Sequence, residues 1–175
     1  MQKTRVFIAS SLDGYIAGPD DELDWLPQDE GIEDTFTPFF EHIGAMLMGR
    51  RTFDVVSGFE GAWPYGETPI VVATSRALAT PLASVTSAAG DIAQLIDRAK
   101  QLASGRDVYI DGGALIRSAM DAGLVDEITV TMIPIVLGAG LPLFAGCERR
   151  HPLGLLGARS IGGGLVELTY AATRD

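Results

Sequence analysis

The chain has 175 residues, 47% of them hydrophobic, and a formal net charge of −10 at pH 7. This length predicts one domain over residues 1–175, and the acidic charge disfavours nucleic acid as a partner because phosphate binding needs a basic face. A single cysteine, Cys147, excludes an internal disulfide, and with only two histidines beside it we expect no metal site. No apolar run reaches the roughly 20 residues of a membrane span and no secretory signal is recognisable, which predicts a cytoplasmic protein without a membrane partner.

The first half of the chain predicts strands separated by loops and short helices. Residues 4–10 (TRVFIAS) and 45–48 (AMLM) are apolar runs typical of buried strands, and residues 11–24 are turn-rich. From Ile32 onward, apolar residues at helical spacing predict a helix, in which Pro38 either occupies the first turn behind a Thr37 N-cap or kinks a longer helix. Residues 51–56 predict a short helix, 58–69 a loop and 70–73 (IVVA) another strand.

The second half continues the alternation and then turns to strands. Asp91 predicts the N-cap of a helix over residues 92–102, which Gly105 ends. A strand over 107–110 (DVYI) and a helix over 114–122 follow, and residues 127–135 and 165–171 alternate as strands do. The whole pattern predicts an α/β fold: a mostly parallel mixed sheet with helices on both faces and an antiparallel C-terminal edge.

Three of the predicted strands end in polar turns. In an open α/β sheet the carboxyl ends of parallel strands share one edge, where ligands bind. Bare glycine backbone before a helix exposes N–H groups to an anion, and guanidinium groups grip phosphate. Each turn alone is more typical of a tight turn or a solvated surface, but together they predict a pocket for a ligand with several phosphates. The turns are Gly49, Arg50, Arg51 and Thr52; Thr74, Ser75 and Arg76; and Asp111, Gly112 and Gly113.

Five segments resemble those of a known family in the same order. They are residues 11–17 (SLDGYIA), 48–53 (MGRRTF), 109–114 (YIDGGA), 124–127 (LVDE) and 133–144 (IPIVLGAGLPLF). These segments are similar to those of the dihydrofolate reductase-like proteins related to the reductase domain of riboflavin biosynthesis. The resemblance implies a dihydrofolate reductase-like fold, NADPH as the cofactor and a homodimer as the assembly.

The resemblance also implies which residues hold the cofactor. Arg50 or Arg51 would meet the ribose 2′-phosphate, which suits NADP better than NAD because a dianion needs cationic partners. The turn after residue 111 would cradle the pyrophosphate, and the loop through Ile16 would lie over the nicotinamide. In full, the implied cofactor residues are Ile16, Ala17, Gly49, Arg50, Arg51, Thr52, Thr74, Ser75, Arg76, Gly112, Gly113, Ala114 and Leu115.

The substrate side carries fewer signals. Folate reductases of the similar family carry a carboxylate at the start of the first long helix, facing the substrate ring. The resemblance therefore implies Glu33, with Asp34 beside it, as one candidate catalytic acid, and Asp13, directly after the first strand, is another. A helix-start acid that complements the dipole and a cap on the turn at residues 11–14 are the ordinary alternatives. Aromatic residues at helical spacing are more often core, but four could line a flat pocket for a heterocycle. These four are Trp25, Phe36, Phe40 and Trp63.

Taken together, the residues and the resemblance predict an NADPH-dependent reductase. It would transfer hydride to a CH-OH or CH-NH type group of a small heterocycle of the pterin or ribosylated-pyrimidine type, such as 5-amino-6-(5-phosphoribosylamino)uracil. Two alternatives stay open, because function does not follow from fold. One is an NADP-binding module that has lost catalysis, and the other is a purely structural dimerisation domain.

Overall fold

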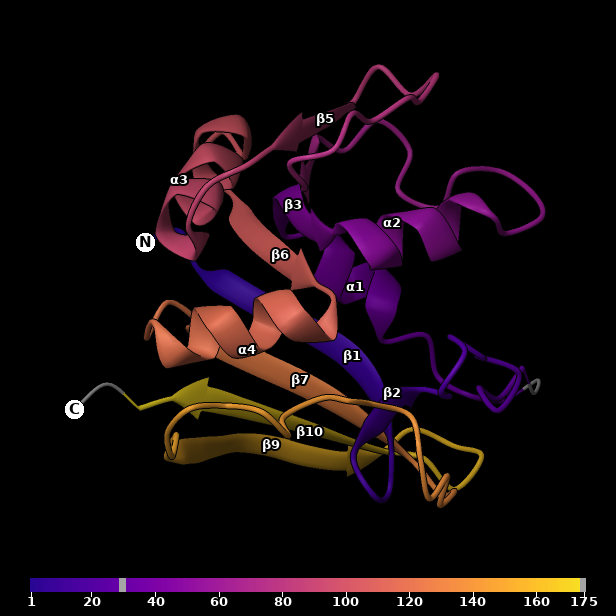
Figure 1. The fold of residues 1–175 in the computed structure, drawn as a ribbon. Helices are drawn as coiled ribbons and strands as arrows, with labels where there is room; N and C mark the ends of the chain where they lie inside the picture. The colour runs from indigo at the N-terminus through magenta and orange to yellow at the C-terminus, as the bar shows by residue number, and fades with distance from the viewer. Residues whose placement is uncertain (29–30, 174–175) are drawn as a thin grey trace.

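The protein folds around one large, mostly parallel sheet (Figure 1). The computed structural model describes residues 1–28 and 31–173. Eight strands lie in the order β5-β4-β3-β6-β1-β7-β10-β9, and β2 pairs with β8 in a small second sheet. The strands are β1 Thr4–Ser11, β2 Tyr15–Ala17, β3 Ile43–Gly49, β4 Ile70–Ala73, β5 Val85–Ala88, β6 Asp107–Asp111, β7 Glu127–Ile133, β8 Leu141–Pro142, β9 Leu153–Ser160 and β10 Val166–Ala172. The helices are α1 Phe36–Phe40, α2 Arg50–Ser57, α3 Ile92–Leu102 and α4 Gly113–Asp121.

The parallel part of the sheet runs from β5 to β7, and its two last strands are antiparallel. β1 pairs in parallel with both β6 and β7, whereas β10 pairs antiparallel with β7 and with β9. The predicted α/β fold with an antiparallel C-terminal edge is thus confirmed. Because the parallel strands all point the same way, their carboxyl ends meet on one side of the sheet, and the arrowhead of β6 points toward the side where α2 lies (Figure 1).

Helices cover both faces of the sheet, as the alternation along β3 shows. Ala45 and Leu47 point into a core that they share with the buried residues of α3 and α4. Met46 and Met48 point into the opposite core, against aromatic residues of α1 and α2. Successive side chains of a strand point to opposite faces, so an uninterrupted apolar run is what a strand buried on both sides needs.

Local sequence signals predicted the ends of most strands and helices to within one or two residues of their ends in the structure. Asp91 caps α3 in a full capping box with Gln94, and the helix ends before Gly105, whose φ is +83°. The predicted Thr37 N-cap is wrong, because α1 begins at Phe36 behind Thr35. Pro38 lies within the first turn of this five-residue helix, where its missing N–H leaves no hydrogen bond unmade.

Four strands were not predicted, and each lacks a periodic signal. β2 and β8 are only three and two residues long. β5 carries one buried residue, Val85, followed by polar or exposed positions. β9 is exposed along almost its whole length, so no apolar alternation marks it. None of the helices within residues 1–28 and 31–173 is long and apolar enough to span a membrane.

Candidate functional site

Two helix N-termini lie side by side at the carboxyl edge of the sheet. β3 and β6 are neighbours, with Met48 opposite Asp111, and each strand leads directly into a helix, α2 and α4. Gly112 has a φ of +110°, and a Cβ there would lie 2.7 Å from Thr52 Oγ1 and 3.5 Å from the Gly49 nitrogen. Only glycine allows this close approach of the two turns. The unpaired N–H groups of two helix starts therefore gather on one side of the sheet.

A cavity of about 500 Å³ opens beside these two turns. Its lining combines the helix starts with apolar residues of the loop after β2 and of α2. This volume falls in the range of small-molecule and cofactor sites, about 300–1,000 Å³. The lining residues are Ile8, Ala9, Ile16, Ala17, Asp21, Leu23, Leu26, Gly49, Arg50, Arg51, Thr52, Val55, Val56, Phe59, Ala73, Asp111, Gly112, Gly113, Ala114, Leu115, Arg117, Leu141 and Pro142.

Both arginines at the start of α2 line the cavity and both have protein partners. Arg50 Nε donates to Asp54 Oδ1 at 2.8 Å, one helical turn away, and its Nη1 donates to the Ala77 carbonyl at 3.1 Å. Arg51 Nε donates to both carboxylate oxygens of Asp21, at 2.6 and 2.9 Å. The bond to Asp21 is the main reason why the pKa of Arg51 is raised. The Arg51–Asp21 pair joins the loop after β2 to α2 at the wall of the cavity.

Asp111 is a carboxyl group in the cavity wall with an unusual pKa. Burial raises its pKa from 3.8 to about 6, and a hydrogen bond from the Gly112 backbone offsets part of this rise. Tyr65 and Tyr109 lie near enough that the Asp111 charge helps burial to raise the pKa of both phenols. A carboxyl group with a pKa near neutrality can hold a proton and release it close to physiological pH.

Most of the predicted cofactor residues line this one cavity. They come from three separate parts of the chain: β2, the turn into α2 and the turn into α4. The third predicted turn lies just outside the lining, beyond Ala73, and is closed by a bond from the Arg76 N–H to Thr74 Oγ1 at 3.1 Å. The predicted residues in the lining are Ile16, Ala17, Gly49, Arg50, Arg51, Thr52, Gly112, Gly113, Ala114 and Leu115, and those outside it are Thr74, Ser75 and Arg76.

The two predicted catalytic acids lie outside the cavity lining and have structural partners. Asp13 accepts hydrogen bonds from the Ser11 hydroxyl at 2.7 Å and from the Leu137 and Gly138 N–H groups at 3.1 and 2.7 Å. These bonds lower its pKa and tie the first turn to the distant loop before β8. Glu33 pairs with Arg159 of β9 at 2.7 Å.

Asp34, the neighbour of Glu33, also has a local role. It accepts hydrogen bonds from the first N–H groups of α1, those of Phe36 and Thr37. This is the helix-start role that the sequence offered as the ordinary alternative.

The predicted aromatic pocket is part of the protein core. Phe36 and Phe40 stack at 5.2 Å between ring centroids and pack against the face of the sheet that α1 covers. Trp63 packs on Phe53 at 5.8 Å, and Trp25 packs on a third cluster around Ile133. None of the predicted four lines the cavity.

Sequence reasoning missed the side chains that form the apolar half of the cavity. Leu23 and Leu26 lie in a turn-rich loop, where isolated leucines carry no periodic signal. Val55 and Phe59 belong to α2 and the turn after it, and Phe59 is 54% exposed, which is unusual for a phenylalanine. Asp111 did have a signal, because it directly precedes the Gly-Gly turn that the sequence singled out.

Comparison with known proteins places this chain in a family. The family model of the RibD C-terminal domain matches residues 2–166. The uncharacterized protein YwjB of Bacillus subtilis (strain 168) is 33% identical over 171 residues, which are 97% of each chain.

Solved structures agree with this match. A putative riboflavin biosynthesis protein from Shewanella sp. PV-4 superposes with a TM-score of 0.88 at 32% identity, over 99% of this chain and 100% of that one. A dihydrofolate reductase from Enterococcus faecalis, complexed with NADP(H), has a TM-score of 0.70 at 16% identity over 98% and 97% of the two chains, and so shares the fold. The chain therefore has a dihydrofolate reductase-like fold and belongs to the oxidoreductase family of the RibD C-terminal domain.

Proposed function

We propose that this protein is an NADPH-dependent reductase of a small heterocycle of the pterin or ribosylated-pyrimidine type, similar to 5-amino-6-(5-phosphoribosylamino)uracil. The group reduced would be of the CH-OH or CH-NH type. One observation carries the proposal: the close approach of Gly49 and Gly112 sets two helix N-termini and two arginines at the wall of one cavity. Family membership supports reductase chemistry.

The cofactor half of the cavity fits a dinucleotide with phosphates. A Cβ at Gly112 would collide with Thr52, so only glycine lets the turn into α4 lie this close to the start of α2. Phosphate oxygens placed at this edge would meet the N–H groups of both helix starts. Arg50 and Arg51 stand at the same wall and can form charge-assisted bonds with a 2′-phosphate. Ile16 and Ala17 of β2 would then cover the nicotinamide ring. NADPH bound here would supply the hydride.

The apolar half of the cavity fits the substrate. Leu23 and Leu26 of the loop after β2 line it together with Val55 of α2 and Phe59, and few polar groups lie among them, which suits a flat ring system. The exposed face of Phe59 can stack on such a ring. An apolar wall also excludes water, which protects hydride transfer from side reactions.

The reduction needs a proton as well as a hydride, and Asp111 is the group that we propose as its source. Asp111 lines the cavity next to the cofactor turn, and its pKa of about 6 leaves roughly one tenth of the carboxyl groups protonated at pH 7, far more than at the ordinary pKa of 3.8. Asp13 and Glu33 are held outside the cavity by their own hydrogen bonds, so neither is placed to do this. We therefore assign to Asp111 the role of catalytic acid that the sequence predicted for Asp13 or Glu33.

The module without catalysis remains the second candidate, because both acids predicted from the sequence lie outside the cavity. One experiment distinguishes the reductase from the NADP-binding module without catalysis. NADPH binding is measured first by the change in its fluorescence, and NADPH oxidation is then followed with a panel of pterins and ribosylated pyrimidines. Binding with turnover of any panel member supports the reductase, binding without turnover supports the module, and failure to bind at high micromolar NADPH rejects both.

We further propose that the protein is a homodimer. β9 ends the sheet, and its Leu155 and Leu156 side chains are each 60% exposed. Natural proteins rarely leave a long apolar edge strand open, because it can pair with another chain. A light-scattering mass of two chains that falls to one in Leu155→Asp/Leu156→Asp supports this assembly, whereas a one-chain mass for the unaltered protein rejects it.

A further inference from the structure

A second cluster of reactive side chains lies at the opposite end of α4 from the cavity. α4 begins with Gly113 in the cavity wall and ends with Asp121. Cys147 and His151 come from the loop between β8 and β9 and meet Asp121 there. One ligand atom from each of the three residues, a carboxylate oxygen, the thiol sulfur and a ring nitrogen, lies within 4.8 Å of the other two. It is the one such trio in the part of the chain that the structure describes.

The geometry points to a zinc site formed by Asp121, Cys147 and His151. Carboxylate, thiolate and imidazole are all zinc ligands, and three protein ligands with one open position are typical of zinc sites that also hold water. Ligand atoms around a tetrahedral zinc lie roughly 3.3–3.8 Å apart, because the bonds are about 2.0–2.3 Å long. The Asp121–His151 distance of 2.8 Å would widen to this value, and the other distances, all within 4.8 Å, are reached by small movements of the side chains.

The surroundings of Asp121 are arranged as those of a metal ligand are. The Glu148 N–H donates to both carboxylate oxygens of Asp121 at 3.1 Å, which fixes the orientation of the carboxylate. His151 Nε2 lies 2.8 Å from Asp121 Oδ1, and a zinc ion would replace this direct bond by lying between the two atoms. Such supporting bonds orient metal ligands in proteins. The side chains of His151 and Asp121 are only 15% and 17% exposed. An acid at the last residue of a helix also faces the negative end of the helix dipole, and a bound cation would offset this repulsion.

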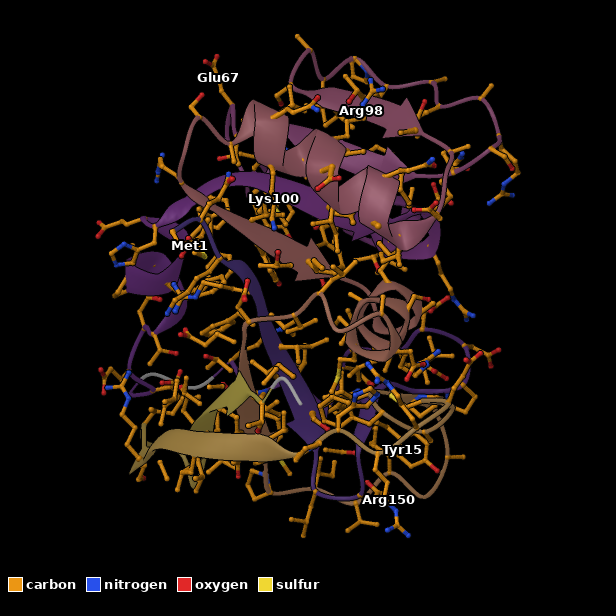
Figure 2. All side chains as sticks on the ribbon, turned by 90° about the vertical axis from the view of Figure 1, so that its left-hand side faces the viewer. Met1, Tyr15, Glu67, Arg98, Lys100 and Arg150 are labelled. Carbon is orange, nitrogen blue, oxygen red and sulfur yellow. The ribbon has the colours of Figure 1, made fainter. Side chains whose placement is uncertain are left out.

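A second cavity borders the cluster on one side. Its volume is about 260 Å³, and its wall includes His151 of the cluster together with Arg149 and Arg150. Figure 2, which looks onto the C-terminal end of α4, shows Arg150 projecting outward from the loop. The open position of the metal would face this cavity if it lay on the His151 side of the cluster, where water or a small anion could reach it. The two exposed arginines favour an anion there.

The sequence predicted no metal site, because one cysteine and two histidines are too few to form a zinc site by themselves. The missing ligand is a carboxylate that lies 26 residues before Cys147 and reaches it only through the fold. A zinc ion would fasten the loop at residues 144–152 to α4. Because zinc binds the folded chain, it would stabilise the fold by an amount that rises with the logarithm of the free zinc concentration above Kd.

Cobalt binding to the metal-free protein tests the site. The chain is treated with a chelator, desalted with a non-thiol reductant and titrated with Co²⁺ and, in a parallel sample, with Zn²⁺. We expect one ion per chain, visible absorption of the intensity typical of four-coordinate cobalt, an ultraviolet thiolate-to-cobalt band, and a rise in the unfolding midpoint with zinc. Absence of the thiolate-to-cobalt band in the unaltered protein overturns the proposal.

Matched variants assign the ligands. Cys147→Ser should abolish the ultraviolet band, and His151→Gln and Asp121→Asn should each weaken Co²⁺ binding at least tenfold, with circular dichroism confirming that each variant is folded. His42→Gln, which replaces the other and exposed histidine, should bind as the unaltered protein does. A thiolate band that persists in Cys147→Ser, or equal Co²⁺ affinity in all variants, contradicts the assignment without any reference to reductase activity.

Discussion

Replacing Gly49 with alanine should weaken cofactor binding while leaving the free energy of unfolding nearly unchanged. Gly49 has φ −66° and ψ 147°, which alanine adopts without strain. The added Cβ would lie 3.7 Å from Thr52 Oγ1 and 3.9 Å from both the Asp111 carbonyl and Leu115 Cδ1, all ordinary contacts. Alanine is a poorer N-cap than glycine by a few tenths of a kcal/mol or more, but it restricts the unfolded chain by about 0.4–1 kcal/mol. The free energy of unfolding should therefore change by less than about 1 kcal/mol.

Cofactor binding should respond quite differently. The three atoms around the new methyl group belong to residues that line the cavity, so the methyl stands between the two helix N-termini. A phosphate moved away by one methyl group loses a charge-assisted bond of about 1.5–3 kcal/mol, or roughly 10- to 150-fold in Kd. The assay is a fluorescence titration with NADPH beside a thermal unfolding curve.

The control is Gly154→Ala, where a Cβ would meet nothing within 4 Å and which lies on β9, away from the cavity. It should keep NADPH affinity. Gly113 does not serve as a test position, because a Cβ there would lie 2.9 Å from Ile16 Cδ1 and 3.2 Å from the Pro142 carbonyl and would disturb the fold itself. If Gly49→Ala binds NADPH as tightly as the unaltered protein while remaining folded, the phosphate path does not run past these turns.

The remaining predictions concern charge at the cavity. Arg50→Ala/Arg51→Ala should weaken NADPH binding by roughly tenfold or more and NADH binding much less; equal losses for the two cofactors would remove the 2′-phosphate contact. Asp21→Asn should tighten NADPH binding severalfold, because it releases Arg51 from its bidentate partner; weaker binding in a titration would show that Asp21 supports the site instead. Folding raises the pKa of Asp111 from 3.8 to about 6, so the ionised carboxylate destabilises the folded state fully above pH 6 and not below pH 3.8. Asp111→Asn should therefore raise the free energy of unfolding by about 2–3 kcal/mol at pH 8 and little at pH 4, and should abolish turnover; the same stability change at both pH values contradicts the raised pKa.

Much of the fold could be predicted because its signals are local. The apolar runs that became β1 and β4 and the capping residue of α3 each lie within a few residues of the structure they specify. β9 could not be predicted in this way. Its position depends on pairing with β10, while its own residues are exposed and include two glycines.

The candidate site likewise combines features that local sequence predicts with features that depend on residues distant in the sequence. The Gly112 turn is a local feature of a strand that runs directly into a helix, so its position at the cavity followed from the sequence. The roles of Asp13 and Glu33 depend on partners 125 and 126 residues away, Gly138 and Arg159, and nothing near either acid indicated them. Asp111 needed the burial of the folded state to gain its raised pKa.

A crystal structure of the protein soaked with NADPH tests the central claim most directly. The account predicts phosphate groups on the backbone N–H groups at the starts of α2 and α4, with the 2′-phosphate within hydrogen-bonding distance of Arg50 or Arg51 and the nicotinamide beside Ile16. NADPH bound elsewhere on the molecule, with the edge between Gly49 and Gly112 left empty at saturating cofactor, would contradict it.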